Sequence, residues 1–114
     1  MAVAMFGRLP LSPPAYDSLL VSLELDISPP GGLILHLAAE GEDGIDICEV
    51  WQTHEAAEGF VRGVLEPRLF RLGVDERVAF SLLPLHNLYA PDLDTIERIG
   101  AVSVPGLAAG DVIR

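Results

Sequence analysis

Alternating side chains mark residues 45–51 of this chain, Ile-Asp-Ile-Cys-Glu-Val-Trp, as a β-strand. Because successive residues of a strand point to opposite faces, Ile45, Ile47, Glu49 and Trp51 are expected to share one face. That face is apolar at one end and carries a carboxylate and an indole at the other. It is therefore a candidate wall for a pocket.

A first helix is predicted from Ser12 onward. Ser12 is a good N-cap, and the two prolines that follow suit the first helical positions. A buried stripe follows at helical spacing, and its members are Tyr16, Leu19, Leu20, Leu23 and Ile27. The helix is expected to end before residues 28–32, Ser-Pro-Pro-Gly-Gly, which break regular structure.

A second, longer helix is predicted after Thr53, which is a suitable N-cap. Its apolar stripe consists of Phe60, Val61, Val64, Leu65, Leu69 and Leu72. Pro67 should kink or split this helix, because proline removes an interior hydrogen bond. Gly73 is a natural stop.

Three further strands are predicted, at residues 2–9, 33–39 and 77–89. The polar residues 40–44 form a turn of hairpin length between the second and third strands. Pro84 inside the last strand indicates a bulge or an edge position.

The resulting order, β-α-β-β-α-β, is typical of the ferredoxin-like α+β fold, a four-stranded antiparallel sheet with helices on one face. Residues 1–89 would form this domain. Residues 90–114 would form a C-terminal tail, with a short helix within residues 92–99, that is either mobile or laid across a partner subunit. The uncovered sheet face is too apolar to be left in water. We therefore expect a homodimer in which two sheets enclose a barrel.

Charge and composition exclude several classes of function. The formal charge of −10 over 114 residues disfavours nucleic acid and anionic membranes as partners. All seven basic side chains are arginines, so no lysine is present to form a Schiff base. Cys48 is the only cysteine and is expected to be a small buried hydrophobe. We expect a cytoplasmic protein, because the N-terminus lacks the pattern of a signal peptide.

Residues 49–60, Glu-Val-Trp-Gln-Thr-His-Glu-Ala-Ala-Glu-Gly-Phe, resemble the strand-to-helix signature of the dimeric α/β-barrel superfamily. This group includes antibiotic biosynthesis monooxygenase-like and stress-responsive barrel proteins. Residues 65–69 and 84–87 are also similar to small members of the group. The resemblance covers roughly residues 3–89 and leaves the reaction open, since members include oxygenases, isomerases, cyclases and haem-degrading enzymes.

The resemblance implies one site residue directly, because Trp51 matches a tryptophan that often lines the pocket in this group. The haem-degrading branch has an asparagine in the first strand and a histidine within the second long helix. This chain has Phe6 and Arg8 in the first strand, and His54 only at the first turn of the helix. We therefore expect no haem and no other cofactor.

Strand parity would bring three titratable residues, His36, Glu49 and His86, into the barrel interior, while Cys48 and Val50 pack under the helices. A histidine near a carboxylate can transfer protons at neutral pH, so these three are the candidate catalytic residues. The candidate substrate-binding residues are Trp51, Phe6, Arg8, Tyr16 and Phe80.

Structural roles compete with each of these assignments. Both histidines could be structural, Trp51 could be core, and Glu49 could simply pair with Arg8. Two histidines and a carboxylate could also ligate a metal. No two of these residues are close in the sequence, however, and we expect no metal site.

These residues predict a cofactor-independent tailoring enzyme, cyclase or monooxygenase-like, that acts on a hydrophobic polyketide-type molecule. The alternatives are a non-catalytic ligand-binding or stress-responsive barrel protein and an accessory subunit of a biosynthetic enzyme.

Overall fold

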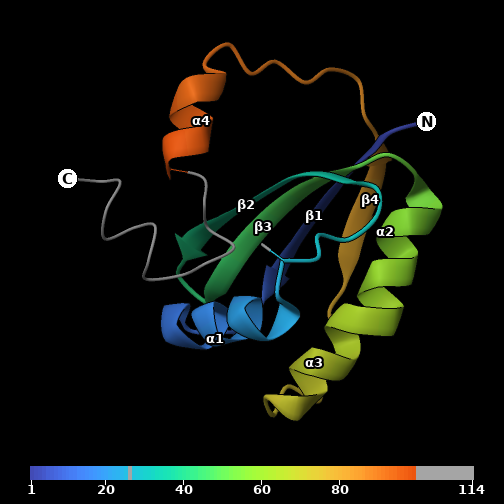
Figure 1. Cartoon of the computed structure of the whole chain (residues 1–114). Helices are drawn as coiled ribbons and strands as arrows, with labels where there is room; N and C mark the ends of the chain where they lie inside the picture. Colours follow the sequence, from blue (N-terminus) through green and yellow to red (C-terminus); the bar gives the residue numbers. More distant parts are fainter. Residues whose placement is uncertain (26, 100–114) are drawn as a thin grey trace.

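The computed structural model describes residues 1–25 and 27–99. A four-stranded antiparallel sheet has the order β2-β3-β1-β4. Its strands are β1 (Val3–Leu9), β2 (Leu33–Gly41), β3 (Gly44–Trp51) and β4 (Phe80–Pro84). Helix α1 (Pro13–Leu23) and the long helix after β3 pack on one face of this sheet (Figure 1). The predicted ferredoxin-like α+β fold is confirmed.

Helix α1 begins as predicted, with the Ser12 hydroxyl accepting a hydrogen bond from the Ala15 N–H. It ends earlier than the apolar stripe suggested. Glu24 takes a left-handed conformation with φ of 52°, which closes the last turn. Ile27 therefore lies outside the helix and is 75% exposed, so its assignment to the buried stripe was wrong.

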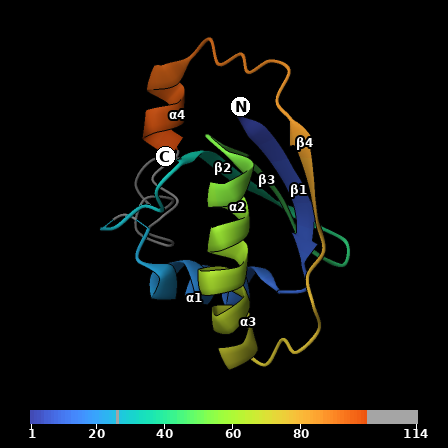
Figure 2. The same cartoon turned by 90° about the vertical axis from the view of Figure 1, so that its right-hand side faces the viewer.

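The second helix is continuous and contains one widened turn. It consists of α2 (His54–Phe60), the π-helical segment η1 (Val61–Leu65) and α3 (Glu66–Arg71), which form a single column in Figure 2. Thr53 caps it as predicted. The N–H of Glu66 bonds to the carbonyl of Val61, immediately before Pro67. Pro67 has no N–H to offer the preceding turn, and the wider turn makes room for its ring.

The last strand is shorter than residues 77–89, because β4 spans only Phe80–Pro84. It is an edge strand, as the proline indicated, and it ends at that proline. A short helix, α4 (Leu93–Ile99), follows within the predicted tail and buries no residue. The rest of the tail, residues 100–114, lies outside the described residues.

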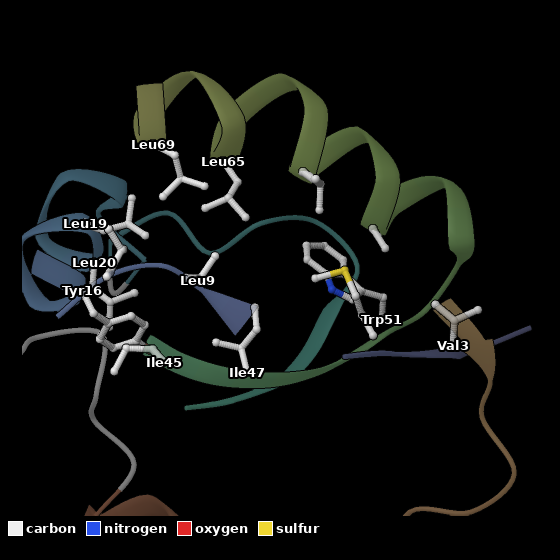
Figure 3. Packing of buried hydrophobic residues seen from close by; sticks show 14 residues of the cluster. Val3, Leu9, Tyr16, Leu19, Leu20, Ile45, Ile47, Trp51, Leu65 and Leu69 are labelled. Carbon is white, nitrogen blue, oxygen red and sulfur yellow. The ribbon is translucent and has the colours of Figure 1, made fainter. Parts of the chain in front are cut away.

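The hydrophobic core lies between the sheet and the helices. Leu19, Leu20, Leu65 and Leu69 reach from the helices towards Leu9, Ile45, Ile47 and Trp51 of the sheet (Figure 3). The other face of the sheet bears apolar side chains that no helix covers. Phe6, Leu37 and Leu83 are 45%, 49% and 55% exposed, respectively. Among the described residues, no helix is long and apolar enough to cross a membrane.

Candidate functional site

A chain of hydrogen-bonded side chains is buried between the sheet and the helices. The carboxylate of Glu49 on β3 accepts from two neighbours. Trp51 Nε1 is 2.9 Å from Glu49 Oε1, and His36 Nδ1 is 2.5 Å from Glu49 Oε2. Tyr16 Oη on α1 is 2.6 Å from His36 Nε2, so four residues form one chain.

The strand register explains why these groups meet. His36 lies directly opposite Glu49 in the β2–β3 pair, and Trp51 is two residues further along β3 on the same face. Tyr16 lies on the buried side of α1 and reaches down to the sheet. Phe60 packs against the indole of Trp51, with ring centroids 5.4 Å apart. Two strands and two helical segments therefore hold the chain of groups in place.

The hydrogen bonds assign the proton positions. The indole N–H can only donate, so Glu49 accepts from it. His36 Nδ1 donates a hydrogen bond to the other carboxylate oxygen. Nε2 therefore carries no proton and can accept a hydrogen bond from the Tyr16 hydroxyl. Burial, and secondarily the charge of Glu49, raise the pKa of Tyr16 above its ordinary value of 10.0. Tyr16 is therefore a protonated donor at neutral pH.

Three predicted site residues, His36, Glu49 and Trp51, share one face, but it is not the face that we predicted. They lie under the helices and not in the interior of a barrel. The larger apolar residues Ile45, Ile47 and Trp51 occupy the core between sheet and helices, and Glu49 follows them because it shares their parity. The carboxylate is tolerated there since it is fully hydrogen-bonded.

Cys48 and Val50 correspondingly do not lie under the helices. They occupy the face that no helix covers, where Cys48 pairs with Phe6 on β1 and Leu37 on β2. Burial raises the pKa of the Cys48 thiol, which leaves it a poor nucleophile.

Three other predicted residues lie apart from the buried chain. His86 follows the end of β4 and is exposed, because Pro84 ends the strand before it. Phe6 and Arg8 lie on the uncovered sheet face. Arg8 Nε is 2.7 Å from Asp46 Oδ1, its cross-strand neighbour, so the proposed pairing of Arg8 with Glu49 was wrong.

Phe80 faces the helices but lies at the other side of the sheet, beside Gly7. It lines an open cleft of about 360 Å³ between η1 and the chain leading into β4. Arg62 and Arg77 also line this cleft. Neither arginine was predicted as a site residue, because hydrophobic periodicity does not reveal which surface charges converge.

A small cavity of about 20 Å³ adjoins the buried chain of groups. Tyr16, His36 and Glu49 line it together with leucines, among them Leu9 and Leu65. This volume accommodates about one water molecule. Across residues 1–25 and 27–99, no three His, Cys, Asp or Glu side chains are grouped as metal ligands would be.

The sequence predicted His36 and Glu49 but not the bond from His36 to Tyr16. One signal was available. A tyrosine on a buried stripe needs a partner for its hydroxyl, and His36 is the only polar residue in the apolar run of residues 33–39.

Comparison with known proteins gives structural matches only, since neither protein-family models nor curated sequences match this chain. Rv0793 from Mycobacterium tuberculosis is 17% identical with a TM-score of 0.56, covering 79% of this chain and all of that one. A provisionally assigned antibiotic biosynthesis monooxygenase from Deinococcus radiodurans is 18% identical with a TM-score of 0.53, covering 79% and 97%.

A mutant of SnoaB, a cofactor-independent oxygenase from Streptomyces nogalater, is 15% identical with a TM-score of 0.50, covering 76% of this chain and 93% of that one. At these identities the matches establish the fold and not the reaction. The predicted resemblance is thus confirmed at the level of structure: the chain has the fold of the antibiotic biosynthesis monooxygenase-like proteins of the dimeric α/β-barrel superfamily.

Proposed function

We propose that this chain is a cofactor-independent tailoring enzyme of secondary metabolism that uses acid–base chemistry on a hydrophobic, polyketide-type molecule. The observation that carries the proposal is the buried chain from Tyr16 through His36 and Glu49 to Trp51. A base held by a carboxylate in a site shielded from water is the arrangement that proton abstraction requires. The shared fold is consistent with this class.

In this mechanism His36 is the base. A substrate hydroxyl, or an acidified C–H, replaces the Tyr16 hydroxyl at Nε2 and transfers its proton there. Glu49 then stabilises the imidazolium, and the Trp51 N–H keeps the carboxylate oriented. The displaced Tyr16 stays protonated and donates to the oxygen on which negative charge develops.

The chemistry after this step depends on the substrate. An electron-rich polycyclic phenolate can react with O₂, which would oxidise a ring methylene to a carbonyl and release one molecule of water. A substrate with a reactive carbonyl would instead cyclise, because the carbanion adds to that carbonyl and the imidazolium returns the proton. Both outcomes begin with the same proton transfer to His36.

The active form in this proposal is a homodimer joined through the uncovered sheet face. Support comes from the exposed apolar residues of this face, among them Phe6, Leu37 and Leu83. Single exposed apolar residues are ordinary, but a group of them across adjacent strands favours an interface. Two such faces stacked together would form the interior of the barrel.

A second candidate function is ligand binding without catalysis. It is favoured by the cavity beside His36, which is only about 20 Å³ and whose polar side chains are already hydrogen-bonded to each other. Catalysis requires Tyr16 to move away and admit the substrate, whereas a structural role for these groups requires no such movement.

Oxygen uptake separates the two candidates. A panel of polycyclic quinols and anthrones is incubated with the protein, and O₂ consumption and product masses are recorded. Catalysis predicts turnover that His36→Ala lowers by about 10²–10⁴-fold. His86→Ala is the matched control, because that histidine is exposed and should leave turnover unchanged.

Circular dichroism and size-exclusion chromatography confirm that each variant is folded. Turnover unaffected by both His36→Ala and Tyr16→Phe would reject this site. Binding of the panel without O₂ uptake, a change of product mass or a change in chromatographic retention, which a cyclised isomer would show, would favour the second function.

A further inference from the structure

The cleft between η1 and the chain leading into β4 is not used by the proposed chemistry. Its volume is about 360 Å³, and a second hollow of about 530 Å³ adjoins it. The lining combines apolar residues, namely Met5, Val61, Val78, Ala79, Phe80 and Leu82, with the charged residues Glu58, Arg62 and Arg77. A cleft of this size that joins an apolar part to a few charged groups can hold a small amphipathic molecule.

The two arginines of the cleft converge on one carboxylate oxygen. Arg62 Nη1 is 3.6 Å and Arg77 Nε is 3.7 Å from Oε2 of Glu66. Both distances are too long for hydrogen bonds. That oxygen is buried and has no hydrogen-bond partner within the part of the chain that the structure describes. Glu66 therefore holds the two guanidinium groups near each other without engaging their N–H donors.

A guanidinium has five N–H donors in a planar fork, which suits a carboxylate, sulfonate or phenolate oxygen. Arg62 and Arg77 border both hollows. An anionic group placed between them would lie at the edge of the apolar lining. The rest of the ligand could then pack on Phe80, an aromatic residue inside the cleft.

Acidic side chains near the cleft oppose the long-range attraction of such an anion. Glu58 also lines the cleft, and its carboxylate is 3.7 Å from His54 Nε2. Asp75, Glu76 and Glu66 itself line only the adjoining hollow. With a chain charge of −10, attraction over long distances does not favour an anion. Selectivity must therefore come from direct contact with the two guanidinium groups.

We propose that this cleft binds a small amphipathic anion, namely an aromatic ring system with one carboxylate, sulfonate or phenolate group held between Arg62 and Arg77. The inference goes beyond the proposed function, because it requires binding only and no reaction at His36.

A matched pair of fluorescent dyes tests the proposal. 8-Anilinonaphthalene-1-sulfonate and N-phenyl-1-naphthylamine share one aromatic body, and only the first carries a sulfonate. The wild-type protein should bind the sulfonate at least about tenfold more tightly, as expected for charge-assisted hydrogen bonds. The double variant Arg62→Gln, Arg77→Gln should bind both dyes with similar affinity.

Arg8→Gln is the matched control, because Arg8 lies on the sheet face away from the helices. This variant should keep the preference for the sulfonate. Equal affinities of the two dyes for the wild type would overturn the proposal. So would a preference that survives in the double variant or disappears in Arg8→Gln.

A second measurement covers the case in which the double variant fails to fold. In the wild type, the arginine Nε–Hε resonances are recorded by NMR during titration with the sulfonate dye. Shifts at Arg62 and Arg77 support the proposal, and shifts confined to Arg8 overturn it. Neither measurement depends on O₂ uptake, so failure of this site and failure of the proposed catalysis can be told apart.

Discussion

His36 and Glu49 face each other across the β2–β3 pair, with Nδ1 of the imidazole 2.5 Å from Oε2 of the carboxylate. Both side chains are nearly buried, with 12% and 7% of their surfaces exposed. A carboxylate is seldom buried unless it is paired and hydrogen-bonded. Glu49 meets this condition because a second donor, the Trp51 N–H, occupies its other oxygen.

The first prediction concerns the charge of Glu49. Glu49→Gln should lower the free energy of unfolding by about 1.5–3 kcal/mol, because two charge-assisted hydrogen bonds become neutral ones and one amide N–H is directed at a donor. Urea denaturation followed by circular dichroism measures this change.

Glu42→Gln is the control, since Glu42 is exposed in the β2–β3 turn. Its effect should stay within about 0.5 kcal/mol. Equal effects of the two substitutions would mean that the hydrogen bonds of Glu49 contribute nothing to stability.

The second prediction concerns stability at alkaline pH. The pKa of Tyr16 is raised in the folded protein, first by burial and then by the charge of Glu49. The folded state therefore keeps the phenol proton at pH values where the unfolded chain releases it. The stabilising contribution is complete below pH 10 and is lost as pH rises above it, by up to about 1.4 kcal/mol per pH unit.

Tyr16→Phe should remove this part of the decline in stability above pH 10. Tyr89→Phe is the matched control, because Tyr89 is 80% exposed, and it should keep the decline of the wild type. Denaturation curves recorded between pH 8 and pH 11 provide the comparison. Identical pH profiles for Tyr16→Phe and the wild type would exclude a buried, protonated Tyr16.

Much of the fold follows from local chemistry that the sequence displays directly. Ser12 and Thr53 are caps whose hydroxyls accept the expected backbone hydrogen bonds. The parity of β3 correctly placed Glu49 and Trp51 on one face. These features depend on residues a few positions apart, so sequence spacing determines them.

The wrong face predicted for Glu49 and the missed convergence of Arg62 and Arg77 involve parts of the chain that are distant in sequence. Parity defines two faces of β3 but does not say which face the helices cover. The buried position of Glu49 depends on His36, 13 residues away, and on the indole of Trp51. Although Arg62 and Glu66 are an i, i+4 pair on one helix, the approach of Arg77 to Glu66 depends likewise on how the helix packs against the segment before β4. No local pattern encodes such contacts.

The third prediction concerns the close approach of β1 and β4. Gly7 lies opposite Phe80, and a Cβ atom at position 7 would overlap the phenylalanine ring. Gly7→Ala should therefore lower the free energy of unfolding by about 1–3 kcal/mol, as expected for an overpacked site. Because Phe80 lines the cleft, the variant should also weaken binding of the sulfonate dye.

Gly59→Ala is the matched control for this substitution. A Cβ atom at position 59 meets nothing within 4 Å, and the residue lies inside α2. Alanine is the better helix former, so this variant should raise stability by about 0.5–1 kcal/mol. Thermal denaturation of both variants measures the two effects. Destabilisation by Gly59→Ala would contradict the open space around position 59.

The last prediction concerns the uncovered face of the sheet. Phe6 and Leu37 are opposite neighbours of Cys48, one on each side of β3, so together they form the middle of this face. In the proposed dimer, a charge placed here would be buried without a partner, which is strongly unfavourable. Phe6→Arg and Leu37→Arg should therefore each convert the dimer to a monomer that keeps its secondary structure.

Phe70→Arg is the control for these two substitutions. Phe70 is 69% exposed on α3, in the helical layer, so this variant should leave the dimer intact. Light scattering coupled to size-exclusion chromatography gives the mass of each species. A wild-type mass of one chain, or dimers of unchanged stability in both sheet variants, would reject pairing through this face.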